Sequence, residues 1–198
     1  MRTLLLSVLG CFLLPISVRA DEAEDKAAAL VKKLGGWIKR DEKVPGKPVV
    51  SVDLLGTKTA DSDLKELAAL KQLRSLRLAL TKVTGVGLKE LIGLPHLVTL
   101  DLAGTEPTDD GLKHLATLKQ LRTLNLLDTP LTDAGLKKLV TLKQLQSLDL
   151  RNTQVRDVGM KELALLKELQ ELSLRDTKVT DVGLKELARA GALQAIAG

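Results

Sequence analysis

Few residues of this 198-residue chain have side chains suited to nucleophilic, acid–base or metal chemistry. Its only histidines are His96 and His114, and its only cysteine is Cys11. Zinc sites and disulfide frameworks need several such residues, which excludes both. We expect the two histidines on the outer surface, away from any serine or cysteine nucleophile. The prediction is therefore a protein without catalytic residues, metal or cofactor.

Aromatic side chains, which stack on bases and sugars, are almost absent. The chain has no tyrosine, one phenylalanine (Phe12) and one tryptophan (Trp37). Its formal charge is +5, and about +3 without the two arginines of the first 20 residues. So mild a charge without stacking platforms indicates no nucleic-acid partner.

The elements that position the remaining side chains come from a repeat of 24 residues. The pattern L-x-x-L-x-L-x-x-T-x-V/L-T-D-x-G-L-K-x-L-x-x-L-x-x occurs six times over residues 49–192, and residues 193–198 begin a seventh unit. Six units in one register point to a repeat architecture in which neighbours share a core. The units begin at Val49, Leu73, Leu97, Leu121, Leu145 and Leu169.

Each unit changes its apolar period halfway. The L-x-L half alternates with period two and predicts a short strand, as at Leu76 and Leu78. The second half spaces leucines at three, as at Leu88 and Leu91, and predicts a helix. Translation of this unit gives an α/β solenoid with parallel strands on one face and helices on the other.

Two polar rows recur within the repeat. The threonine row is expected to pair buried backbone groups at the strand exits as a structural ladder. The aspartate row is expected to cap the helices rather than to bind calcium. The threonines are Thr57, Thr81, Thr105, Thr129, Thr153 and Thr177, and the aspartates are Asp61, Asp109, Asp133, Asp157 and Asp181.

The repeat resembles the leucine-rich repeat, with threonine in the slot that usually holds asparagine or cysteine. Its V-T-D-x-G-L-K-x-L half is similar to the cysteine-containing subclass of F-box proteins, and more so to exported bacterial repeat proteins. The resemblance implies a horseshoe-shaped solenoid whose concave sheet binds a protein or peptide. The alternative, an F-box-like receptor of a ubiquitin ligase, lacks an F-box-like helical module in residues 21–48.

We expect the concave face, formed by the outward side chains of the strands, to hold the binding residues. Charged contacts should dominate its C-terminal half, and an apolar anchor its N-terminal half. The candidate residues are Asp53, Leu55, Arg77, Leu80, Asp101, Asn125, Leu127, Asp149, Arg151, Ser173, Arg175 and Asp176. The alternative site for an anionic lipid or wall polymer is the convex lysine row, Lys65, Lys89, Lys113, Lys137, Lys161 and Lys185.

The two ends differ from the repeats. Residues 1–20 resemble a secretory signal cleaved after Ala20, which predicts a secreted or periplasmic protein with no other membrane contact. A lipoprotein signal at Cys11 is the alternative. Residues 21–48 should cap the solenoid with a helix and an edge strand at Trp37. The C-terminal tail should pair as a last strand or leave an apolar end for a weak homodimer.

Overall fold

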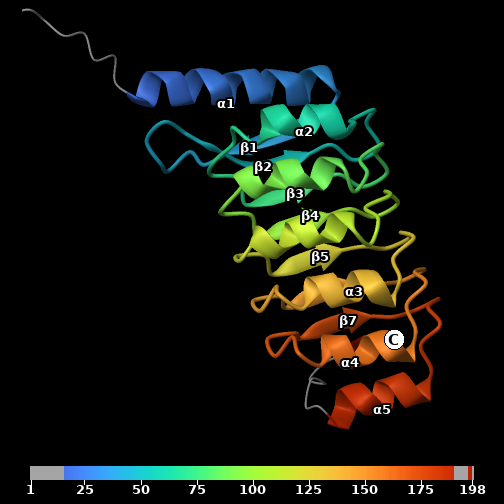
Figure 1. Cartoon of the computed structure of the whole chain (residues 1–198). Helices are drawn as coiled ribbons and strands as arrows, with labels where there is room; N and C mark the ends of the chain where they lie inside the picture. The colour runs from blue at the N-terminus through green and yellow to red at the C-terminus, as the bar shows by residue number, and fades with distance from the viewer. Residues whose placement is uncertain (1–15, 190–195, 198) are drawn as a thin grey trace, which may run out of the picture.

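The computed structural model describes residues 16–189 and 196–197, and the side chains of residues 22–189. One sheet contains eight strands in chain order (Figure 1). Strand β1 pairs with β2 antiparallel, and every later pair is parallel. The predicted α/β solenoid with a parallel sheet is confirmed. The strands are β1 (Trp37–Arg40), β2 (Val49–Asp53), β3 (Ser75–Arg77), β4 (Thr99–Asp101), β5 (Thr123–Asn125), β6 (Ser147–Asp149), β7 (Glu171–Ser173) and β8 (Ile196–Ala197).

The register of the sheet equals the period of the sequence. Leu76 pairs with Leu100, and Leu100 pairs with Leu124, so the same repeat position is stacked from strand to strand. These leucines are buried, as are the leucines that face them from the helices. A single repeat could not bury its leucines alone, and stacking gives one continuous core.

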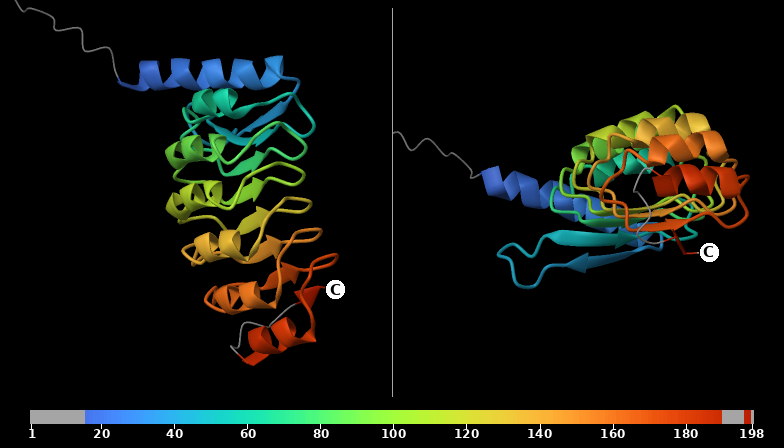
Figure 2. Two further views of the ribbon diagram at one scale, coloured as in Figure 1. Left: turned by 45° about the vertical axis from the view of Figure 1, so that its right-hand side comes forward. Right: turned by 90° about the horizontal axis from the view of Figure 1, so that it is seen from below.

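One short helix follows each of the strands β2–β7. The helices lie on the side of the core opposite the sheet, and the stack bends gently with the sheet on its inner side (Figure 2). The sheet side is the concave face, and the helix side is the convex face. The helices are α2 (Asp61–Leu67), η1 (Gly87–Gly93), η2 (Gly111–Thr117), α3 (Asp133–Leu139), α4 (Asp157–Leu163) and α5 (Asp181–Arg189).

The helices of the second and third repeats, η1 and η2, are 3-10 rather than α-helical, which the sequence pattern did not predict. Each follows a residue that is already helical in conformation, Val86 or Asp110, and neither residue caps the helix with its side chain. By contrast, α3 follows an extended Thr132 whose hydroxyl accepts from the Ala134 N–H at 3.2 Å. In the second and third repeats the threonine hydroxyl still caps a turn, because Thr84 accepts from the Val86 N–H at 3.2 Å and Thr108 from the Gly111 N–H at 3.1 Å, but the 3-10 helix begins only after that turn.

The helix α1 (Ile16–Lys33) covers the N-terminal end of the core. Its residues Ala27, Ala28 and Val31 are buried in the common core. Arg40 of β1 joins this helix to the sheet, because its guanidinium bonds Glu24 and Asp25 at 2.9 Å each. The predicted cap therefore consists of a helix and an antiparallel edge strand. The helix begins before Ala20 and continues past it.

At the other end, β8 pairs with β7 in the parallel register of the repeats, so the tail contributes a last strand. The predictions for Cys11 and most of the signal segment concern residues 1–15, which lie outside the described residues. Among the helices that the structure describes, none is long and apolar enough to cross a membrane.

Candidate interaction face

The central column of the concave face consists of the last residue of each of the strands β2–β7. The register places these residues side by side, because Asp53 pairs with Arg77 and Arg77 pairs with Asp101. The Arg77 guanidinium bridges its neighbours, with Nη1 3.4 Å from Asp53 and Nε 3.2 Å from Asp101. The column continues through Asn125, Asp149 and Ser173.

The charges of the C-terminal half are paired with one another. Arg151 donates to Asp149, two residues earlier, through Nε at 2.9 Å and 3.0 Å and through Nη2. The hydrogen bond and charge of Asp149 raise the pKa of the Arg151 guanidinium further. Arg175 is more exposed, and among the described residues its guanidinium bonds only its neighbour Asp176, at 3.2 Å. Of the expected charged contacts, Arg175 is therefore the one whose guanidinium is more free for a partner.

The N-terminal half of the concave face carries an apolar ridge after the strands. Leu55 is 42% exposed and Leu80 is 63% exposed, with Ala79 buried between them. The main chain keeps the neighbouring repeats paired here, because the Gly56 N–H donates to the Ala79 carbonyl at 2.9 Å. Leu127, the third residue predicted for this anchor, is half-buried and so less exposed than Leu55 and Leu80. It lies two repeats beyond Leu80.

Leu80 has a left-handed backbone, with φ of +56°. The residues 24 positions before and after it are Gly56 and Gly104, which also have positive φ. Glycine adopts this conformation without steric cost, whereas leucine does so at a cost of about 1–2 kcal/mol. Asp176 occupies the same repeat position, so Leu80 and Asp176 belong to one column at the strand exits.

A row of hydroxyl groups beside the central column was missed by the sequence analysis. Its residues are two positions before those of the column and are half-buried on the same face. Among the described residues, none of these hydroxyls has a hydrogen-bond partner on the protein, so all are open to an external one. The period-two alternation was the signal that would have found them. The row is Ser51, Ser75, Thr99, Thr123 and Ser147.

Trp37 also belongs to the concave face. It pairs with Asp53 in the antiparallel register of β1 and β2, and paired residues lie on the same face of a sheet. Its side chain is 79% exposed. From the sequence, Trp37 is expected only in a structural edge strand, because a single tryptophan outside the repeat has no period that reveals its face.

The threonine row bonds the main chain. Each of its six hydroxyls donates to the carbonyl oxygen three residues earlier, at 2.7 Å for Thr129 and Leu126. Among the described residues, a main-chain amide also donates to the hydroxyl oxygen only at Thr57 and Thr177, at 3.4 Å in both. At the other four threonines of the described chain, the hydroxyl contributes to the turn after the strand only through its bond to the carbonyl oxygen.

Four members of the aspartate row join successive repeats by accepting a main-chain N–H bond from the next repeat, a role that the expectation of helix capping did not include. They are Asp61, Asp109, Asp133 and Asp157. Asp61, in the first turn of α2, accepts from the Thr84 N–H at 2.8 Å and the Thr84 hydroxyl at 2.7 Å. Asp109 makes the same pair of bonds to Thr132. Stacking places the start of each helix beside the next, so the carboxylate reaches across the repeat boundary. We call this two-bond contact the aspartate clamp.

The glycine of T-D-x-G is explained by the same contact. A side chain at Gly135 would lie 2.3 Å from Oδ1 of Asp109, and one at Gly159 would lie 2.6 Å from Oδ1 of Asp133. Only glycine leaves room for the carboxylate of the preceding repeat. The second repeat has Gly85 where the others have aspartate, and there Gly85 and Gly111 pack main chain against main chain.

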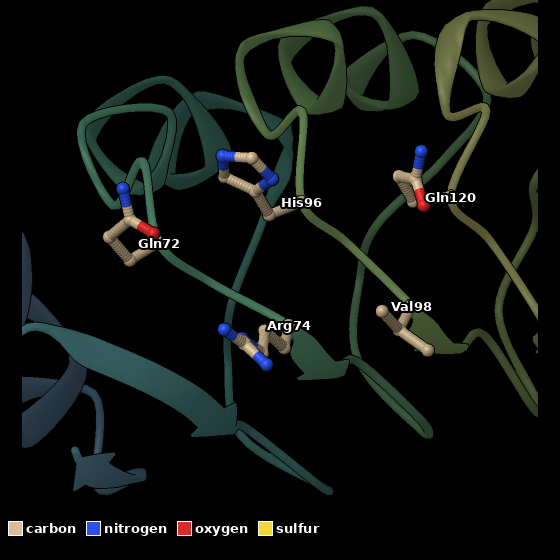
Figure 3. Close-up of a pocket in the computed structure, with 5 residues that line it drawn as sticks. All are labelled: Gln72, Arg74, His96, Val98 and Gln120. Atoms are coloured by element: carbon tan, nitrogen blue, oxygen red, sulfur yellow. The ribbon is translucent and has the colours of Figure 1, made fainter. Parts of the chain in front are cut away.

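Both histidines line hollows of the described surface. One of about 260 Å³ lies where the loops enter the strands, lined by His96 with Gln72, Arg74, Val98 and Gln120 (Figure 3). No carboxylate and no nucleophile lines it. His114 lines a second hollow on the convex face beside Lys89 and Lys113. The six lysines of the convex row are exposed. In residues 16–189 and 196–197, no group of three potential metal ligands occurs.

Comparison with known proteins points to one family. A family model described as a leucine-rich repeat matches residues 93–116, 118–140, 142–164 and 168–188. The chain is similar to a leucine-rich repeat protein of Leptospira interrogans, with 28% identity and a TM-score of 0.54 over 68% of this chain and 33% of that one. It is also similar to an internalin of Listeria monocytogenes, with 23% identity and a TM-score of 0.42 over 73% of this chain and 53% of that one. The chain thus spans about a third of the length of the Leptospira protein. No curated protein sequence matches it.

Proposed function

The chain is a leucine-rich repeat protein, and from that premise we propose that it is a non-enzymatic scaffold that binds another protein through its concave face. The leucine-rich repeat scaffold is typical of protein binding. The observation that supports the concave face is its row of five hydroxyls without a protein partner, beside the charged column and the apolar ridge. Such a surface offers hydrogen bonds and an anchor along one continuous strip.

The strip has the dimensions of a modest contact. Strands lie about 4.8 Å apart, so the parallel strands β2–β7 span roughly 25–30 Å. Standard interfaces bury about 800 Å² on each partner, which is more than a flat sheet of this size offers. The expected partner is therefore a peptide-like segment, or a protein that reaches the loops as well.

Site-specific photo-crosslinking tests this assignment even while the partner is unidentified. A photoreactive amino acid is placed at Thr99 or Asn125 on the concave face, and at Lys137 or Lys161 on the convex face, in cells that make the protein. We expect specific protein adducts from the two concave positions. Adducts from the convex positions alone would move the site to the lysine row.

Charge reversal gives the second test once a partner is captured. Arg175→Glu should weaken binding about tenfold, because a hydrogen-bonded contact to a charged group contributes about 1.5 kcal/mol or more. Lys161→Glu, the same change on the convex face, should leave the affinity unaltered. Arg151→Glu is unsuitable, because it would place a second carboxylate against Asp149.

We propose, in addition, that the protein is exported and that its signal segment is removed after Ala20. The buried residues of the cap, Ala27, Ala28 and Val31, all follow that bond, so the processed chain keeps them. Intact-mass measurement of the exported protein should give a chain that starts at Asp21. A chain that retains Met1 in the cytoplasm would contradict export.

A further inference from the structure

The outer edge of β1 has no strand beside it. Strand β1 is the first in the order of the sheet, and its only strand partner is β2. Apart from that pairing, no main-chain hydrogen bond of residues 37–40 reaches any other described residue. The β1–β2 hairpin also projects beyond the stacked repeats, on the side away from the convex helices (Figure 2, right). An unpaired edge of this kind is a template for another strand.

The pairing pattern shows which groups face that edge. The Leu54 N–H donates to the carbonyl of Arg77 at 2.9 Å, so the main chain of Leu54 is directed toward β3. The main-chain N–H and C=O groups of successive strand residues point to opposite edges of the strand. Those of Asp53 therefore point toward β1, where Asp53 pairs with Trp37. The main-chain N–H and C=O of Trp37 therefore point toward β2. Those of Ile38, the next residue, point to the open edge.

The side chains of β1 alternate in the same way. Trp37 and Lys39 are exposed on the concave face, whereas Ile38 and Arg40 are half-buried on the core side. Arg40 is occupied by its ion pairs with α1. The Lys39 ammonium, by contrast, has no ion-pair partner among the described residues. The open edge is thus flanked by a large apolar side chain and an unpaired cation, two residues apart.

We propose that the edge of β1 binds an extended peptide segment as an additional strand of the sheet. The segment carries an apolar residue beside Trp37 and an acidic residue, two positions away, beside Lys39. Directly opposite residues of neighbouring strands are in contact, so this spacing matches the pleat. Main-chain hydrogen bonds hold the segment, and the two side chains select it. This edge lies outside the strip assigned to the concave face and does not depend on that assignment.

The chain contains its own reporter for the experiment, because Trp37 is its only tryptophan and it has no tyrosine. The probes are two capped synthetic peptides, TTLTETT and TTETLTT, which offer the apolar and acidic residues in both strand directions. Trp37 fluorescence is titrated with each peptide. We expect a saturable blue shift for one of them, with a Kd below about 1 mM, as the indole leaves water. The peptide that binds also gives the direction of the added strand.

Controls separate strand addition from simple apolar contact. A copy of the binding peptide that is N-methylated at its three central residues cannot pair with the edge and should not bind. Lys39→Glu should weaken binding at least about fivefold, and a Glu→Lys peptide should restore it. Lys137→Glu on the convex face should change nothing. The proposal is overturned if neither peptide saturates up to about 5 mM, if the N-methylated copy binds equally, or if Lys39→Glu has no effect.

Discussion

The carboxylate of Asp157 in α4 accepts hydrogen bonds from both the N–H and the hydroxyl of Thr180, at 2.7 Å each. Thr180 immediately precedes α5, so this aspartate clamp fastens one repeat to the start of the next helix. The clamp also fixes the charge state of the carboxylate. Hydrogen bonds from the Thr180 N–H, its hydroxyl and the Gly183 N–H lower the pKa of Asp157, against a smaller opposing effect of burial.

The lowered pKa predicts how stability depends on pH. Because the folded state binds the proton of Asp157 less tightly than the unfolded state, the stabilisation is complete above the unfolded pKa of about 3.9. It is lost as the pH falls through the lower pKa of the folded state. We expect Asp157→Asn to lower the urea midpoint at pH 7, and to reduce the fall in midpoint on acidification below about pH 4.

Asp181 is the matched control for the clamp. It has the same position in the last repeat, but no described residue donates a hydrogen bond to it. Asp181→Asn should leave the midpoint at pH 7 and its acid dependence close to those of the unaltered chain. If the two variants behave alike, the aspartates act only through their own helices, and the clamp contributes nothing.

The clamp contacts, unlike the fold, do not follow from the local sequence pattern. The 24-residue period is enough to predict the strands, the parallel register and the buried leucines, because each follows from local patterning. The partner of Asp157 does not follow from it, since the carboxylate and Thr180 meet only when repeats are stacked at a particular angle. The repeat also does not predict that Trp37 of the edge strand lies on the concave face, because antiparallel pairing with β2, outside the repeat, sets that face.

Removal of one hydroxyl of the threonine row should destabilise the middle of the solenoid. Thr129 is buried and its hydroxyl donates to the Leu126 carbonyl at 2.7 Å, to which no described main-chain N–H donates. Thr129→Val keeps the shape of the side chain and leaves this carbonyl unpaired. We expect a loss of about 1–3 kcal/mol in the free energy of unfolding, measured by denaturant titration.

The control for this prediction is Thr123→Val in β5. Thr123 is half-buried on the concave face, and its hydroxyl has no partner among the described residues. Its replacement should change the free energy of unfolding by no more than about 0.5 kcal/mol. Equal losses at Thr129 and Thr123 would remove the role assigned to the hydrogen bond.

Leu80→Asn should stabilise the protein. Asparagine tolerates the left-handed conformation, as Asn152 does at the same repeat position with φ of +53°. Relief of the strained leucine should raise the free energy of unfolding by about 0.5–1 kcal/mol. Leu55→Asn removes an equally apolar exposed side chain without positive φ, so it should give no such gain. A loss at Leu80 would mean that its packing over Gly104 outweighs the strain.

Two changes toward the repeat consensus should have opposite effects. Ala60 precedes α2 where four of the five other repeats place threonine, and Asp63 already accepts from the Ala60 N–H at 2.9 Å. Ala60→Thr adds the missing capping hydroxyl, and should raise the free energy of unfolding by about 0.5–1 kcal/mol. Gly85→Asp would place an aspartate where the second repeat lacks one, but a side chain there would lie 2.2 Å from Oγ1 of Thr108 and 2.4 Å from the Pro107 carbonyl.

Because the Pro107 carbonyl belongs to the main chain, it cannot move aside as a side chain would. Gly85→Asp should therefore lower the free energy of unfolding by about 1–3 kcal/mol, despite matching the consensus. Both variants are compared with the unaltered chain by urea titration followed by circular dichroism. If Gly85→Asp is as stabilising as Ala60→Thr, the second and third repeats can separate enough to accept an aspartate clamp, and their glycine contact is not a fixed feature of the stack.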